Sequence, residues 1–205
     1  MTGDMTGNMT GGRRFARYSA TRPSQHIRTA DAMAELTPTP SSPVTVHLAL
    51  GGNMGDRAAN LAEAIRRLGE AVEIDAQSAL YETAPMYVTD QPAFLNMAVR
   101  GTTRLDPQAL LRFIKGIEST LGRDLGGLRF GPRPIDIDIL FYADRVLAGP
   151  DLEIPHPRMA ERAFVLCPLA DIAADVLHPV LNRRIDTLRD EVPGRETVLR
   201  IAEGL

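Results

Sequence analysis

The chain has 205 residues, of which 44% are hydrophobic and 24% are charged, a composition typical of a globular protein with one core. Its formal net charge of −3 lacks the surplus of Lys and Arg with which general nucleic-acid-binding proteins neutralise phosphates. No apolar run approaches the roughly 18 residues of a membrane span, and a single cysteine, Cys167, excludes an intrachain disulfide and fits a reducing compartment. We therefore expect a cytoplasmic protein without a nucleic-acid or membrane partner, and a monomer is our starting expectation.

Residues 1 to 43 differ in composition from the rest of the chain. They open with the near-repeat MTGD, MTGN, MTGG and continue through Arg, Ser, Thr and Pro without apolar periodicity. This pattern predicts a disordered tail, although an Arg-rich segment with few acidic residues leaves an organelle transit peptide as an alternative. We expect one folded domain over residues 44 to 205.

The first half of this domain alternates between strand and helix patterns. Val44 to Leu50 reads as a buried strand, and apolar residues recur at helical spacing from Arg57 to Leu68. Val72 to Tyr81 predicts a second strand and Leu95 to Thr103 a third. Between them, Glu82 to Pro92 contains two prolines and little periodicity, so we expect irregular structure there.

The second half begins with a helix signal and contains the clearest strand of the chain. Asp106 suits a helix N-cap, Pro107 suits the first helical position, and an apolar stripe continues to Leu121. A glycine-rich basic loop, residues 123 to 134, precedes the strand-like segment IDIDILFY, residues 135 to 142. Because several strand pairs look antiparallel, we expect an α+β sandwich with helices on a mixed or mostly antiparallel sheet, and not a doubly wound fold.

Two aspartates, Asp136 and Asp138, lie within this strand-like segment. Side chains alternate along a strand, so both carboxylates face one side, about 7 Å apart, while the neighbouring isoleucines face the other. Paired hard oxygen ligands suit one or two Mg²⁺ ions that bridge phosphate oxygens. The alternative is an amphipathic strand with a solvated acidic face.

The basic loop before this strand adds a second feature of phosphate chemistry. Arg123, Arg129 and Arg133 are interspersed with Gly126, Gly127 and Gly131. Arginine binds phosphate in a bidentate manner, and phosphoryl transfer depends mostly on alignment and on charge stabilisation, which a closing arginine loop would supply. The alternative is a loop of solvated arginines.

The strand-to-helix connection GGNMGD, residues 51 to 56, is not a nucleotide loop by its spacing. It lacks the GK[ST] ending of a Walker A motif and the GxGxxG spacing of dinucleotide loops. We predict that it forms a turn.

Two further segments carry side chains that suit a flat heterocycle and its phosphates. Phe94 and Asn96 offer an aromatic face and an amide, and Phe164 lies a little after Arg162. His156 stands between two prolines and could donate to a phosphate. For each aromatic residue taken alone, core packing is the alternative.

Taken together, these segments form a recognisable pattern. The order GGNMGD, YETAPMYVTDQPAFLN, GIESTLGR, RFGPRPIDIDIL and IPHPRMAERAFVLCPLADI, from Val44 to about Pro179, resembles the 6-hydroxymethyl-7,8-dihydropterin pyrophosphokinase family. The resemblance implies a ferredoxin-like α+β fold, ATP as donor, two Mg²⁺ ions, and AMP leaving as the pterin hydroxyl attacks the β-phosphorus. The role would be in folate biosynthesis.

The resemblance also implies roles for individual residues. Asp136 and Asp138 match the two metal ligands and, with Arg123 and Arg133, form the catalytic set. The implied ATP-binding residues are Lys115, Glu118, Arg123, Arg133, Ile139, His156 and Arg162. The implied pterin-binding residues are Thr83, Ala84, Met86, Phe94, Asn96, Phe130 and Phe164.

The sequence departs from the family pattern at several positions. Leu125 and Gly126 stand where some members carry basic loop residues, and Phe130 replaces a tryptophan. Asp151 and Glu153 replace nucleotide contacts, so we assign them no role. The loss of positive charge in the loop predicts weaker ATP binding or slower loop closure. Residues 1 to 43 and the end from about Asn182 fall outside the resemblance.

Two other classes of function stay open from the residues alone. A two-metal hydrolase or another nucleotidyl-type transferase would use Asp136 and Asp138 on a different phosphate. A non-catalytic ferredoxin-like module would bind a metabolite and regulate a partner. No residue stands out as a general base for the attacking hydroxyl.

Overall fold

The computed structural model describes residue 40 and residues 42–86, 89–123 and 131–205. The tail predicted over residues 1–43 lies outside this part of the chain except for its last positions, and it stays a prediction.

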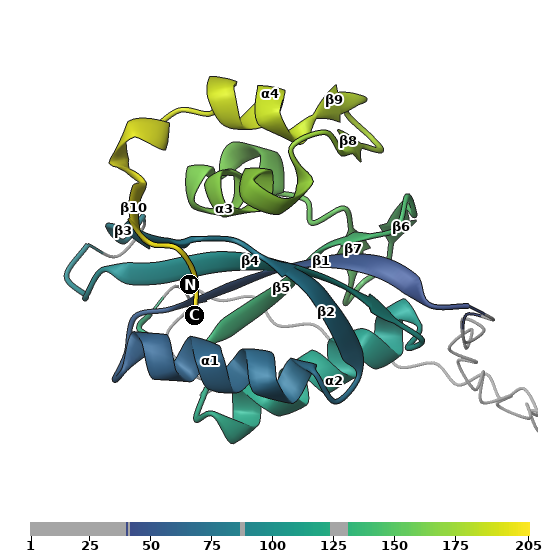
Figure 1. The fold of residues 1–205 in the computed structure, drawn as a ribbon, viewed down its shortest axis with the longest axis horizontal. Helices are drawn as coiled ribbons and strands as arrows, with labels where there is room; N and C mark the ends of the chain where they lie inside the picture. The colour runs from purple at the N-terminus through teal and green to yellow at the C-terminus, as the bar shows by residue number, and fades with distance from the viewer. Residues whose placement is uncertain (1–39, 41, 87–88, 124–130) are drawn as a thin grey trace, which may run out of the picture. The chain divides into compact units, whose positions relative to one another are not determined.

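A six-stranded sheet forms the centre of the domain (Figure 1). Its strand order is β10-β3-β4-β1-β5, and β2 pairs with another stretch of β4. The strand pairs of this sheet are antiparallel, which confirms the expected α+β class. The strands are β1 (Val44–Gly52), β2 (Val72–Gln77), β3 (Leu80–Thr83), β4 (Phe94–Thr103), β5 (Asp136–Tyr142) and β10 (Leu199–Ala202).

The single strand expected from Val72 to Tyr81 is wrong, because the segment forms both β2 and β3. The two strands pair with different stretches of β4, and the chain changes its path at Ser78. There, the Ser78 backbone N–H donates to the Ala98 carbonyl at 2.9 Å, and the Ser78 hydroxyl accepts from the Ala98 N–H at 2.9 Å. These bonds satisfy the backbone of β4 where the ladder is interrupted.

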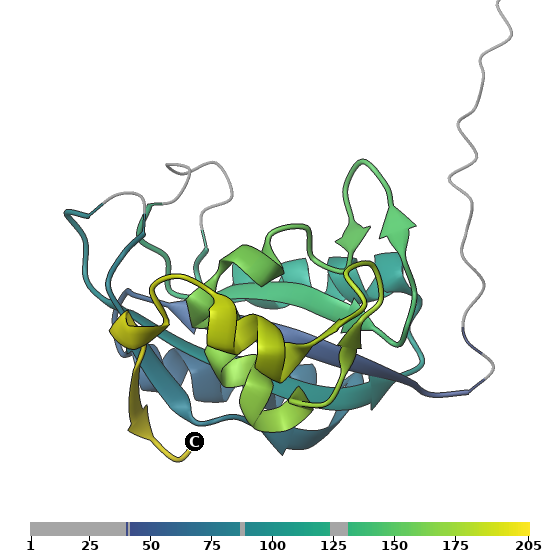
Figure 2. The same cartoon turned by 90° about the horizontal axis from the view of Figure 1, so that it is seen from above.

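Helices cover both faces of the sheet, α1 and α2 on one face and α3 and α4 on the other (Figures 1 and 2). The bounds are α1 (Arg57–Leu68), α2 (Pro107–Thr120), α3 (Ala163–Ala173) and α4 (Ile185–Glu191). Asp56 and Asp106 cap α1 and α2, each by accepting from the backbone N–H three residues later. The predicted helix over 57–68 and the predicted cap at Asp106 are therefore confirmed.

The remaining elements are short. Two small ladders join β6 (Leu147–Ala148) to β7 (Glu153–Ile154) and β8 (Leu177–His178) to β9 (Arg183–Arg184). Single 3-10 turns span Met159–Glu161 and Arg195–Thr197. No helix in the described ranges is long and apolar enough to cross a membrane.

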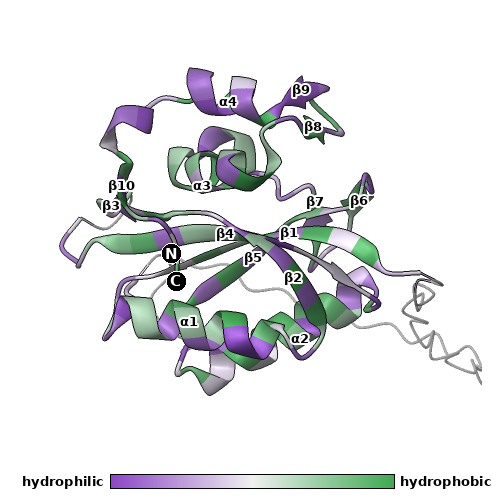
Figure 3. Cartoon of the chain, in the orientation of Figure 1, coloured by the Kyte–Doolittle hydropathy of each residue, from purple (hydrophilic) through white to green (hydrophobic). Residues whose placement is uncertain are grey.

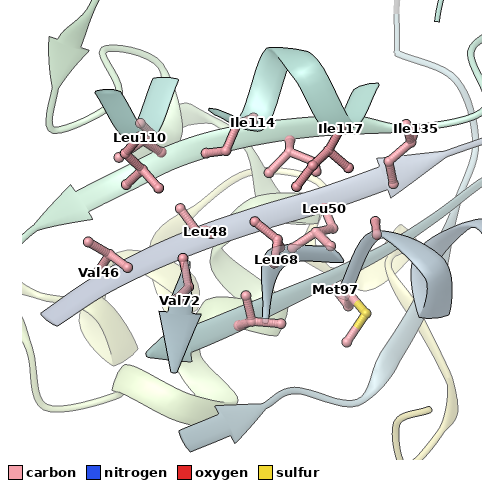
Figure 4. Packing of buried hydrophobic residues seen from close by; sticks show 14 of the residues in the cluster. Val46, Leu48, Leu50, Leu68, Val72, Met97, Leu110, Ile114, Ile117 and Ile135 are labelled. Carbon is pink, nitrogen blue, oxygen red and sulfur yellow. The ribbon is translucent and has the colours of Figure 1, made fainter. Parts of the chain in front are cut away.

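The larger hydrophobic cluster lies between the sheet and the helices α1 and α2 (Figure 4). Leu48, Leu61, Leu110 and Ile114 are fully buried in it. The central strands and α3 are mainly hydrophobic, while β9 is hydrophilic (Figure 3). Burial on both faces fixes the register of the sheet, because a shift of one residue would turn every core side chain to the wrong face.

Candidate active site

The register of the sheet brings three distant segments together at the end of β1. Gly51 lies opposite Asn96 on β4 and opposite Asp136 on β5, and Ala49 lies opposite Asp138. A Cβ atom at Gly51 would lie 2.7 Å from the Asn96 side-chain oxygen. The absence of a side chain at Gly51 therefore leaves room for the Asn96 amide beside the carboxylates of β5.

A cavity of about 250 Å³ opens at this place. Its walls come from β1, β4 and β5, from the segment that follows β3, from α2, and from the beginning of α3. Thirteen residues predicted for the site line it, namely Thr83, Ala84, Met86, Phe94, Asn96, Lys115, Arg123, Arg133, Asp136, Asp138, His156, Arg162 and Phe164.

The two aspartates of β5 point into this cavity, as strand alternation predicted. Asp136 and Asp138 are partly exposed, whereas Ile135, Ile137 and Ile139 are buried in the core on the other face. Burial, and secondarily the Asp136 carboxylate, raise the pKa of Asp138 to about 6. A cation bound beside Asp138 would stabilise the charged form of its carboxylate.

Two arginines hold Asp136. One carboxylate oxygen accepts from Arg133 Nη1 at 2.6 Å, and the other forms an ion pair with Arg123 Nη1. The side chains of both arginines are 19% exposed, so they face the cavity and not bulk solvent. The cations and the carboxylate are thus paired with one another.

Glu118 of α2 lies next to Arg123 and has 0% exposure. Its carboxylate accepts from Arg123 Nη1 at 2.5 Å and from Lys115 Nζ at 3.1 Å. The same oxygen accepts at 2.7 Å from the N–H of Ile137, on the last strand of the sheet order. Burial raises the pKa of Glu118, and these donors oppose that shift. Glu118 therefore joins α2, Arg123 and the edge of β5.

His156 and Arg162 complete the polar wall of the cavity. His156 Nδ1 accepts from the Arg158 N–H at 3.2 Å, which leaves the proton on Nε2, 3.8 Å from Asp138 Oδ2. Burial, and then the Arg162 charge, lower the pKa of His156 to about 4, so the ring is neutral at pH 7. Arg162 Nε is buried without a hydrogen-bond partner among the described residues. An anion in the cavity would find a donor already desolvated there.

Other residues that line the cavity are neutral or aromatic, and we call this set the neutral wall. Asn96 Nδ2 donates to Thr83 Oγ1 at 2.8 Å, and both residues are buried. Phe94 and Phe164 line the same wall, and the Arg162 guanidinium lies 5.7 Å from the centre of the Phe164 ring. Fixed polar groups beside aromatic faces can bind a flat heterocycle with defined orientation.

Some predicted residues lie elsewhere. Ile139 lines a second cavity of about 320 Å³, which shares Lys115, Asp138 and His156 with the first. Asp151 and Glu153 line this second cavity too. Glu118 lies behind the wall and lines neither cavity. Phe130, Leu125 and Gly126 lie outside the described residues.

Sequence reasoning missed two residues, Gln91 and Asn53. Gln91 lines the first cavity, and the Asn53 side chain donates a hydrogen bond to Gln91. Both belong to segments that were singled out, GGNMGD and TDQPAFLN, but neither segment has a helical or strand period that would indicate which side chains point inward. Only their contacts in the folded chain reveal the pair.

Comparison with known proteins identifies the fold and the family. Residues 47–174 match the model of the family described as 7,8-dihydro-6-hydroxymethylpterin-pyrophosphokinase (HPPK). A structure of Plasmodium falciparum HPPK-DHPS aligns with a TM-score of 0.63 at 19% identity, over 78% of this chain and 48% of that one. At this identity the alignment shows the fold alone, and it agrees with the expected ferredoxin-like arrangement.

Two curated relatives are closer in sequence. The 2-amino-4-hydroxy-6-hydroxymethyldihydropteridine pyrophosphokinase of Aquifex aeolicus is 40% identical over 147 residues, which cover 72% of this chain and 91% of that protein. A folate synthesis bifunctional protein of Arabidopsis thaliana is 50% identical over 128 residues, 62% of this chain. The chain spans only 26% of the length of that bifunctional relative. With its family match over more than half of its length, the chain belongs to the 7,8-dihydro-6-hydroxymethylpterin-pyrophosphokinase family.

Proposed function

We propose that the protein transfers a pyrophosphoryl group from ATP to 6-hydroxymethyl-7,8-dihydropterin in folate biosynthesis, with AMP as the second product. One observation carries the proposal: a single cavity is lined both by Asp136 and Asp138 with several cations and by the Asn96 amide with aromatic rings. The first set suits a metal-bound triphosphate and the second a flat, hydrogen-bonding heterocycle. The curated names of the Aquifex and Arabidopsis relatives support the same chemistry.

The carboxylates of β5 fit magnesium. Asp136 and Asp138 share one face of the strand, and no group of three or more His, Cys, Asp or Glu in the described ranges forms a fuller metal cage. Mg²⁺ keeps several waters and is held by one or two carboxylates together with substrate phosphates. We propose that these two residues hold two Mg²⁺ ions, which when bound neutralise charge on the phosphates and make the attacking hydroxyl more acidic.

The protein's own residues would align the reaction. The pterin hydroxyl oxygen bonds to the β-phosphorus as the bond from that phosphorus to the α,β-bridging oxygen breaks, so AMP leaves and the hydroxyl proton is released. Arg123 and Arg133 stabilise the charge on the transferring oxygens, and Arg162 and the Nε2–H of His156 donate to phosphate oxygens. Lys115 contributes a further charge beside them.

The ion pairs around Asp136 support this assignment of roles. Asp136 is bound by Arg123 and Arg133, so a free phosphate would compete with Asp136 for the arginines, and a free cation would compete with the arginines for Asp136. Magnesium-bound ATP supplies both partners at once. Each buried charge then exchanges one partner for another and is not left unpaired, which would be costly.

The neutral wall would bind the pterin. Asn96 and the backbone of Thr83 and Ala84 would read the hydrogen-bonding edge of the ring, and Phe94 and Phe164 would contact its faces. Met86, which is 52% exposed, would cover the ring, and Phe130 is proposed for the same pocket from the resemblance alone. We propose that residues 44–205 form this catalytic domain and that it is cytoplasmic, in line with its single unpaired cysteine.

Product analysis tests the proposal. The purified protein is incubated with ATP, Mg²⁺ and 6-hydroxymethyl-7,8-dihydropterin, and AMP is followed by chromatography beside reactions without pterin or with EDTA. We expect AMP only when pterin and metal are both present. ADP or inorganic phosphate from ATP alone would replace the proposal with a hydrolase, and no turnover by a folded sample would favour a metabolite-binding module.

A further inference from the structure

Asn53 follows β1 in the turn that precedes α1, and its side chain connects two segments far apart in the sequence. Its exposure is 2%. The amide nitrogen donates to Gln91 Oε1 and to the Pro92 carbonyl, both at 3.0 Å. The amide oxygen accepts from the Arg133 N–H at 2.9 Å, and the Asn53 backbone N–H donates to the Arg133 carbonyl at 2.9 Å. Both hydrogens of the amide nitrogen and its oxygen are therefore used.

The two connected segments lead to the two halves of the cavity. Pro92 stands two residues before Phe94, at the start of β4, which carries the neutral wall. Arg133 pairs through its side chain with Asp136, at the start of β5, which carries the charged wall. Asn53 thus fixes the beginnings of both strands to the end of β1.

The glycines beside Asn53 allow this close approach. A Cβ atom at Gly52 would lie 2.2 Å from the Pro134 carbonyl oxygen, so any other residue there would displace the Arg133 segment. The Gly-Gly-Asn sequence therefore has a role beyond the turn that we predicted for it. The glycines leave room for the beginnings of β4 and β5, and the Asn53 amide binds the segments that lead into them.

We propose that Asn53 is a positioning residue that holds the heterocycle-binding and phosphate-binding halves of the cavity in register with each other. Its own side chain points to protein partners, so it acts through Gln91, Pro92 and Arg133. The kinetic part of this inference depends on the proposed pyrophosphoryl transfer. The structural part does not.

Two substitutions separate the two connections. Asn53→Ala removes all side-chain bonds. Asn53→Asp keeps an oxygen that can accept from the Arg133 N–H, but it cannot donate to Gln91 or Pro92. Asn60→Ala is the matched control, because the Asn60 amide also donates to a backbone carbonyl, that of Met54 at 2.9 Å, within the same turn.

Amide hydrogen exchange of the ligand-free proteins tests the structural part. In Asn53→Ala we expect exchange at residues 89–93 and 131–134 to rise at least tenfold, with α3 unchanged. In Asn53→Asp the rise should be confined to residues 89–93, and in Asn60→Ala neither segment should change. Unchanged exchange at Arg133 in Asn53→Ala would overturn the inference, as would an equal rise throughout the chain.

Steady-state kinetics test the functional part on the same variants, after thermal denaturation has shown that they are folded. Because small misplacements of aligned groups are costly, kcat of Asn53→Ala should fall roughly 10- to 100-fold. Asn53→Asp should raise KM for the pterin more than KM for ATP. Normal kinetics in Asn53→Ala, with an active wild type, would overturn the inference alone. A wild type that forms no AMP would overturn the proposed function, and the exchange data would still decide the role of Asn53.

Discussion

The two faces of the sheet differ in the polarity of their buried residues. Against α1 and α2, the buried residues are almost all hydrophobic. They form one cluster that includes Val46 of β1 and Ile139 of β5. Against α3, the sheet carries buried His47 and Ser78, and Asp171 of α3 accepts from the Tyr81 hydroxyl at 3.0 Å. The candidate active site opens on this second face.

This difference shows how one small sheet can combine rigidity with a charged cavity. The apolar face supplies burial that does not depend on pH or on a ligand, and it fixes the register that aligns Asn96, Gly51 and Asp136. The polar face carries the charged groups of the cavity, such as Asp136, Asp138 and Arg133. Changes on the first face should therefore alter stability, and changes on the second should alter chemistry or its pH dependence.

The largest effect is expected for Asp138→Asn, which keeps the size of the side chain and removes its charge. On the proposed mechanism kcat should fall about 1,000-fold or more, because a metal ligand is lost. Stability at pH 7 should not fall, since burial already disfavours the charged form of Asp138. Turnover is measured by AMP formation and stability by urea unfolding. A folded variant with near-normal turnover would remove Asp138 from the site.

A matched pair of core substitutions compares the two faces directly. Leu61→Ala in α1 and Leu166→Ala in α3 each truncate a side chain with 0% exposure, and each should lower the free energy of unfolding by about 2–5 kcal/mol. Only Leu166→Ala should also raise KM for the pterin, because α3 carries Phe164 into the cavity. Equal KM changes in both variants would show that the faces are not independent.

The polar face should also make stability depend on pH through His47. Its two ring nitrogens have no hydrogen-bond partner among the described residues, and the ring makes an edge contact with Phe141. Burial, and then the Arg100 charge, lower its pKa to about 4, while Asp75 opposes the shift. The folded protein thus binds fewer protons than the unfolded chain between pH 6.5 and 4, so stability falls as the pH falls through this window.

His47→Leu should remove that dependence. The lowered pKa of His47 corresponds to about 3 kcal/mol in the free energy of unfolding. Wild type has this stability above pH 6.5 and loses it as the pH approaches 4. Urea unfolding is measured at pH 7.5, 6 and 5. The free energy of unfolding should fall less in the variant than in wild type each time the pH is lowered. Parallel curves would mean that His47 is hydrated in the folded protein and titrates normally.

The sequence predicted what depends on local periodicity. Strand alternation placed Asp136 and Asp138 on one face, and the capping pattern placed Asp106 at the start of α2, because both rules act within a few residues. The break of β2 and β3 at Ser78 was missed, since Val72 to Tyr81 contains no Gly or Pro and the break is set by pairing with β4.

Residues that act across the fold were harder to predict. The family resemblance named Glu118 as an ATP-binding residue but could not show that it would satisfy the Ile137 N–H at the edge of β5. Asn53 sits in a turn whose local sequence suggests only turn geometry, and its partners lie 38 and 80 residues away. Long-range polar contacts of this kind have no period in the sequence.

The smallest expected effect tests the neutral wall of the site. Thr83→Val keeps the shape of the side chain but removes the hydroxyl that accepts from Asn96 Nδ2. A buried donor without a partner should cost about 1–3 kcal/mol of stability, and the freed Asn96 amide should raise KM for the pterin roughly tenfold, equivalent to about 1.4 kcal/mol. KM for ATP should stay within twofold, because the charged wall is untouched. If KM for ATP rises as much as KM for the pterin, the two walls respond as one unit, and the separation of the neutral from the charged half would have to be abandoned.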